Sequence, residues 1–163
     1  MRHPIAIEDL ALSLPPKARL IGIDLGSKTI GLAISDVERR LASPLKTLQR
    51  GAFAKDAQSL AAIFSEFDIA GIVLGLPLDL HGRDNPRAQS TRAFARNLSK
   101  TTSLPIVLWD ERFSTAAVVR SLIANDVSRA RRAQVVDRMA AAHILQGALG
   151  RLGGLARPPT ARL

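Results

Sequence analysis

Residues 20–36 read Leu20-Ile21-Gly22-Ile23-Asp24-Leu25-Gly26-Ser27-Lys28-Thr29-Ile30-Gly31-Leu32-Ala33-Ile34-Ser35-Asp36. Two apolar runs flank a short turn that contains Gly26, and this pattern predicts a pair of adjacent strands. The first strand ends on Asp24, although strands disfavour aspartate. A carboxylate in such an apolar setting needs a partner, and the partners that fit best are a metal ion or a phosphate-bound metal.

The composition describes a single domain with an aliphatic core. The chain has 163 residues, of which 47% are hydrophobic, and it contains no cysteine and three histidines. The absence of cysteine excludes disulfides, thiolate catalysis and Cys-ligated zinc, and three histidines disfavour a zinc hydrolase. No apolar run reaches the length of about 18 residues that a membrane span needs, and the N-terminus lacks a signal-peptide pattern. We therefore expect a cytoplasmic protein with no membrane partner.

The net charge is +9, which favours a polyanionic partner, most often nucleic acid. The charge is uneven, since residues 83–100 hold five cationic side chains and one acidic side chain. The alternative is that the arginines only increase solubility, as in an arginine-rich proteome. Composition alone leaves both interpretations open.

The order of the predicted elements indicates an α/β fold. We expect strands at 18–24, 31–36, 41–48, 69–74 and 104–109, and helices at 53–67, 87–100, 114–125 and 128–149, the last ending at Gly150. Pro44 favours an edge position for the third predicted strand. This order predicts a mixed β-sheet flanked by helices on both faces, within a domain of residues 18–150. Residues 1–17 form an N-terminal extension and residues 151–163 a flexible basic C-terminal tail in this interpretation.

Three acidic residues lie where the predicted fold would bring them together. Asp24 ends a strand, Glu111 follows the strand at 104–109, and Asp137 lies on the last helix. Carboxylates are the ligands that pairs of divalent ions use in phosphodiester hydrolysis. We therefore predict that Asp24, Glu111 and Asp137 are catalytic metal ligands. Two simpler roles stay open: a salt bridge of Asp137 with Arg138 or Arg112, and a helix-terminus charge for Glu111.

Four motifs in series resemble one known family. They are Asp24-x-Gly26-x4-Gly31-x-Ala33-x-Ser35-Asp36, Gly75-Leu76-Pro77-Leu78-x3-Gly82, Asp110-Glu111-Arg112-x-Ser114-Thr115 and Val136-Asp137-x-Met139-Ala140-Ala141-x2-Ile144-Leu145-Gln146. Over residues 18–150 the chain resembles the YqgF/RuvX family of bacterial proteins. The resemblance implies an RNase H-like fold and an endonuclease that uses Mg²⁺ or Mn²⁺ to process the 5′ end of the small-subunit (16S) rRNA precursor. It also implies that Asp24, Glu111 and Asp137 are the family's acids.

Arginines near the acidic motifs are candidate substrate-binding residues, because guanidinium groups suit phosphate. They are Arg83, Arg87, Arg92, Arg96 and Arg112. Few aromatic side chains are available to stack bases, so we expect recognition of the nucleic-acid backbone and shape, with salt-sensitive affinity. The expected partners are the pre-16S rRNA, branched DNA as the alternative, and the small-subunit precursor, bound by a monomer or a homodimer.

Other functions stay open at this point. A Holliday junction resolvase would cut four-way DNA as a two-fold dimer, and a non-catalytic nucleic-acid-binding assembly factor would use the same basic surface. An actin-like or sugar-kinase-like ATPase also opens with Asp-x-Gly on a hairpin. That class needs a second domain for which 163 residues leave no room.

Overall fold

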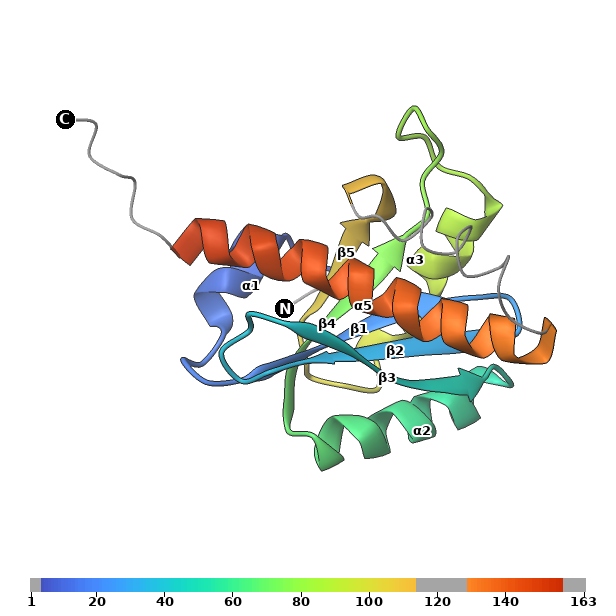
Figure 1. Ribbon diagram of the computed structural model, residues 1–163, viewed down its shortest axis with the longest axis horizontal. Helices are drawn as coiled ribbons and strands as arrows, with labels where there is room; N and C mark the ends of the chain where they lie inside the picture. The colour runs from blue at the N-terminus through green and yellow to red at the C-terminus, as the bar shows by residue number, and fades with distance from the viewer. Residues whose placement is uncertain (1–3, 114–128, 157–163) are drawn as a thin grey trace.

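A computed structural model describes residues 4–113 and 129–156 of the chain. Its centre is one mixed sheet with the strand order β3-β2-β1-β4-β5 (Figure 1). The strands are β1 (Arg19–Leu25), β2 (Thr29–Ser35), β3 (Ala42–Gln49), β4 (Ile69–Leu76) and β5 (Ile106–Asp110). The first three strands pair antiparallel, whereas β4 is parallel to both β1 and β5. This arrangement confirms the predicted mixed sheet, and β3, which contains Pro44, lies at the edge as expected.

Helices cover both faces of the sheet. The helices α2 (Phe53–Glu66) and α3 (Pro86–Ser99) pack on one face, where the buried cluster includes Leu60, Phe94 and Leu98. The opposite face carries α5 (Arg129–Ala156) together with α1 (Ile7–Ser13). In Figure 1, α5 crosses above the sheet and α2 lies below it.

Alternation along β1 and β2 decides which side chains meet α5. Ile21 and Ile23 belong to the buried cluster on the side of α2 and α3, and successive strand residues point to opposite faces. Gly22 therefore faces α5, where an added Cβ would come within 2.7 Å of Leu145 Cβ. Asp24, two residues on, faces α5 as well.

The N-terminal extension contributes to the core of the domain. Its helix α1 buries Leu10 completely in the cluster beneath α5, and the backbone N–H of Ile5 donates to the carbonyl of Ile106 over 2.8 Å. These contacts add apolar burial next to β5, which the weak sequence pattern did not indicate.

The predicted end of the last helix at Gly150 was wrong, because α5 continues to Ala156. Glycine inside a helix costs about 1 kcal/mol relative to alanine, but tertiary packing offsets that cost here. Leu149 and Leu152 are buried in the cluster that includes α1, and Arg151 pairs with Glu8 over 3.2 Å. The predicted helix at 114–125 lies outside the described residues.

Among the described helices, none combines the length and the apolar character that a membrane span requires.

Candidate active site

Asp24 lies in the middle of the sheet, between two glycines on the neighbouring strands. It pairs with Gly31 of β2, and since Ile23 pairs with Leu74 of β4, Gly75 follows beside it. The side chain of Asp24 is only 1% exposed. The glycines leave space above the sheet on both sides of this carboxylate, and α5 and the segment after β5 enter that space.

Asp137 covers the first of these glycines. A Cβ added to Gly31 would overlap the backbone carbonyl of Asp137, so α5 approaches β2 as closely as a glycine permits. The hydroxyl of Thr29, which lies two residues before Gly31 on the same face of β2, donates a hydrogen bond to Oδ2 of Asp137. Asp137 is therefore held beside the strand that pairs with Asp24.

Glu111 covers the second glycine. It is the first residue of the short 3₁₀ helix η1 (Glu111–Phe113), which follows β5 directly. Its Oε1 lies 2.9 Å from the position that a Cβ on Gly75 would take. The carboxylate of Glu111 thus approaches Asp24 from β4 and β5, whereas Asp137 approaches from β2.

The three predicted acids therefore flank the same part of the sheet. Within residues 4–113 and 129–156, however, no three His, Asp or Glu side chains are grouped closely enough to form a metal site as they stand. The donor chemistry fits a divalent ion, because Mg²⁺ and Mn²⁺ prefer carboxylate oxygens. The role of these residues as metal ligands stays a prediction.

Arg112 and Asp110 form an ion pair next to Glu111. The guanidinium donates to Oδ2 of Asp110 over 2.6 Å from Nη2 and 3.0 Å from Nε. Burial raises the pKa of Asp110, but the hydrogen bonds from Arg112 outweigh it and hold that pKa below its usual range. The guanidinium also lies over Gly82, whose φ is +76°. Asp110 thus positions Arg112 against the loop between β4 and α3.

The other predicted substrate-binding arginines do not gather at one point. Arg83 pairs with Asp79 over 3.3 Å and Arg92 pairs with Asp84 over 3.2 Å, and both ion pairs are exposed to solvent. Arg96 is nine residues after Arg87, and nine steps of 100° place it on the opposite side of the helix. Of the five predicted substrate-binding arginines, only Arg87 lines the pocket described next.

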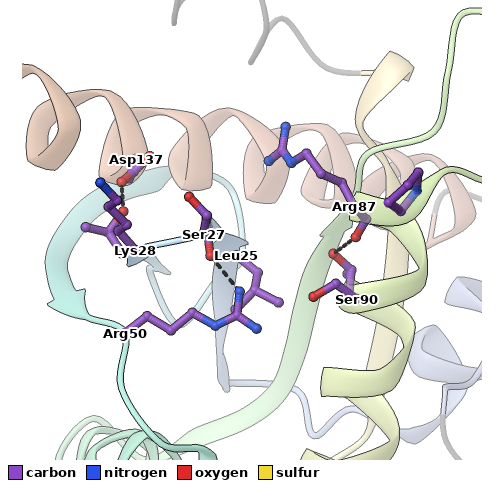
Figure 2. A pocket seen from close by; sticks show the side chains of 11 residues that line it. Leu25, Ser27, Lys28, Arg50, Arg87, Ser90 and Asp137 are labelled. Atoms are coloured by element: carbon purple, nitrogen blue, oxygen red, sulfur yellow. Dashed lines mark hydrogen bonds between the residues drawn. The ribbon is translucent and has the colours of Figure 1, made fainter.

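A pocket of about 680 Å³ opens next to Asp137. It is bounded by the β1–β2 turn, by Arg50 after β3, and by the first turns of α3 (Figure 2). Sequence analysis missed two of its cations, Lys28 and Arg50. Lys28 lies inside the first motif and could have been noticed there. No sequence motif marks Arg50. It reaches the turn only in the folded chain, where Thr29 pairs with Gln49, the residue before Arg50.

A family model and individual relatives match most of this chain and indicate the same family. The family model described as "RuvX: Holliday junction resolvase" matches residues 18–151. A relative from Methylocella silvestris is 59% identical over 148 residues, covering 91% of this chain and 92% of the relative. A relative from Bradyrhizobium sp. is 62% identical over 143 residues, covering 88% and 89%. Both carry the name "Putative pre-16S rRNA nuclease".

A solved structure supports the fold at low sequence identity. The chain titled "T. thermophilus RuvC in complex with Holliday junction substrate" is 15% identical, with a TM-score of 0.54, and the match covers 83% of this chain and 96% of that one. This likeness concerns the fold alone, and it confirms the RNase H-like class with its mixed sheet. From the family model and the relatives together, the chain belongs to the RuvX family.

Proposed function

We propose that this chain is a metal-dependent endonuclease that processes the 5′ end of the 16S rRNA precursor. The observation that carries the proposal is the buried carboxylate of Asp24, with Glu111 and Asp137 over the two glycines beside it. The name shared by the relatives from Methylocella silvestris and Bradyrhizobium sp. supports the choice of substrate. A phosphodiester-cleaving hydrolase in the cytoplasm, where ribosomal precursors are processed, is consistent with both.

Asp24, Glu111 and Asp137 would hold Mg²⁺ or Mn²⁺. A divalent ion at this place would supply Lewis-acid polarisation of the scissile phosphate and neutralise charge on the leaving oxygen. The protein's own part is to hold the ligands still. A strand places Asp24 rigidly, and the hydroxyl of Thr29 fixes the orientation of the Asp137 carboxylate.

The cationic residues around the site would bind the nucleic-acid backbone. Lys28, Arg50 and Arg87 line the pocket next to Asp137, and Asp110 holds Arg112 beside Glu111. Phosphate contacts of this kind position a strand without reading its bases. The RNA itself, or its precursor ribosomal particle, must then supply the selectivity through its shape.

A second candidate function is cleavage of four-way DNA junctions, which the description of the matching family model favours. A junction is cut symmetrically on two strands, so this function needs a two-fold dimer. Sedimentation of the protein with and without a junction therefore discriminates between the two functions, because processing of a single RNA end requires only one copy of the protein.

The experiment compares cleavage of a 5′-extended 16S rRNA precursor fragment with cleavage of a four-way DNA junction. Each substrate is incubated with Mn²⁺ or with EDTA, using the unaltered protein and the Asp24→Asn variant. Asp68→Asn is the matched control, since Asp68 is exposed and immediately precedes β4, at the end of the strand opposite Gly75. We expect metal-dependent RNA cleavage that Asp24→Asn abolishes and Asp68→Asn retains.

Three outcomes would contradict the proposal. Cleavage of the junction only would assign the resolvase function instead. A fully active Asp24→Asn variant would remove Asp24 from the metal ligands. Tight binding of RNA without any cleavage would indicate a non-catalytic assembly factor.

A further inference from the structure

The pocket beside Asp137 gathers positive charge from three separate elements. Lys28 comes from the β1–β2 turn, Arg50 follows β3, and Arg87 lies in the first turn of α3. Figure 2 shows Arg50 and Lys28 on one side of the pocket and Arg87 with Ser90 on the other. Among the described residues of the lining, Asp137 alone is acidic. Side chains distant in the sequence thus converge on a cavity with an excess of positive charge.

These cations differ from the other arginines of the site. Arg83, Arg92 and Arg112 each pair with a nearby aspartate. Within the part of the chain that the structure describes, Lys28, Arg50 and Arg87 form no ion pair with a carboxylate. Cations brought together without carboxylate partners repel one another, and an anion in the pocket would relieve that repulsion.

Arg50 is held in place by contacts that leave its charge uncompensated. Its Nη1 donates to the carbonyl of Gly26 over 2.7 Å, and its guanidinium lies 5.9 Å from the centre of the Phe94 ring. A guanidinium has five N–H donors, so this anchoring leaves donors for a ligand. A preorganised guanidinium binds phosphate oxygens with little loss of side-chain entropy.

The start of α3 adds to the same field. Asn85 caps the helix by accepting from the N–H of Ala88 over 2.9 Å, and its Nδ2 donates to the carbonyl of Pro77. Pro86 and Arg87, the first two residues of α3, line the pocket, so the positive end of the helix dipole lies beside it. The side chains of Ser90 and Thr91 contribute to the lining.

We propose that this pocket binds a phosphate group of the nucleic-acid strand, next to the phosphate that is cut. The inference rests on the proposed function and deepens it, because Asp137 belongs both to the pocket and to the acidic residues around Asp24. A volume of about 680 Å³ falls in the range of about 300–1,000 Å³ that small-ligand pockets occupy. The pocket therefore accommodates a nucleotide unit with its phosphate.

The test measures binding of a short single-stranded RNA by fluorescence anisotropy over a series of salt concentrations, in metal-free buffer where nothing is cut. The variants are Lys28→Gln and Arg87→Gln, both at exposed side chains. The matched control is Lys100→Gln, because Lys100 is exposed at the far end of α3. Each pocket variant should weaken binding about tenfold at low salt. Each should also reduce the slope of log K against log salt by about 0.7.

The phosphate in the pocket has two possible sources, and the RNA is therefore used with a 5′-phosphate and with a 5′-hydroxyl. A backbone phosphodiester predicts the same loss for both RNAs. A terminal phosphate predicts that Lys28→Gln and Arg87→Gln weaken only the 5′-phosphorylated RNA. A separate titration with inorganic pyrophosphate should raise the Tm of the unaltered protein and of Lys100→Gln, but not that of Arg87→Gln.

Unchanged affinity and salt slope in both pocket variants, with an unchanged response to pyrophosphate, would overturn the inference. If the unaltered protein still cuts RNA in that case, the proposed function stands without the pocket. If pyrophosphate binds in the pocket but no RNA is bound or cut, the proposed function fails and the site is a phosphate site of another kind. That result would also overturn the assignment to a nucleic-acid strand.

Discussion

Gly31→Ala is expected to push α5 away from the sheet at the active site. The added methyl group would overlap the backbone carbonyl of Asp137, and a helix backbone cannot rotate aside as a side chain can. The helix must shift or the strand must bend. Either movement changes the position of Asp137 relative to Asp24, which pairs with Gly31 across β1 and β2.

Both stability and activity should fall. Overpacking of a core costs about 1–3 kcal/mol, and a domain of this size loses about 2–4 °C of Tm per kcal/mol. We therefore expect Tm to fall by about 2–12 °C. A displacement of about 1 Å between catalytic groups can reduce the rate about 100-fold. We expect cleavage at a temperature well below Tm to fall by about that factor.

The assay combines thermal unfolding by circular dichroism with cleavage of the RNA substrate. Gly150→Ala is the matched control, because a Cβ at Gly150 meets nothing within 4 Å. Alanine is the better helix former, so this control should gain up to about 1 kcal/mol in stability and keep its activity. A Gly31→Ala protein with unchanged Tm and unchanged cleavage would refute the close approach of Asp137 to β2.

Three further predictions concern single contacts. Thr29→Val should reduce cleavage or metal affinity about 10–100-fold, because Asp137 loses the hydroxyl that orients it, whereas Thr29→Ser should retain most of both; equal activity of the two variants would contradict this. Asp110→Asn should lower stability near neutral pH, and the stabilities of variant and unaltered protein should converge as pH falls below about 4. The folded-state pKa of Asp110 is lowered, so its contribution is present above the unfolded-state pKa and is lost as pH falls through the folded-state value; urea unfolding at several pH values measures it, and a constant difference would refute it. Leu10→Ala should destabilise the protein by about 2–5 kcal/mol, since Leu10 is fully buried, and an unchanged urea midpoint would show that α1 contributes nothing to the core.

The central strands were predictable because their pattern is local. The apolar runs around Gly26 encode two strands whatever surrounds them, and the structure has these strands as β1 and β2, within two residues of the expected bounds. The same holds for the helix that begins at Phe53. The position of Pro44 on an edge strand also follows from one residue, because proline lacks the N–H that an interior strand would need.

Features that depend on distant partners were missed or wrong. Helix α5 passes through Gly150 because Leu149 and Leu152 are buried in the cluster shared with α1. Local propensity would have ended it there. Arg50 belongs to the candidate site only because the pairing of β2 with β3 brings it to the carbonyl of Gly26.

By itself, the sequence determined which chemistry is available: a strand-borne carboxylate at Asp24, two further acids in order, an excess of cations and no thiol. Only the tertiary structure decided where these groups meet. Nothing in the sequence around the glycines at 31 and 75 indicates which residues pack over them, yet the folded chain places Asp137 over one and Glu111 over the other. The physical reason is that strand alternation and residue chemistry are local properties. The distance between a helix and a sheet, by contrast, is set by which side chains, or which missing side chains, face each other across the core.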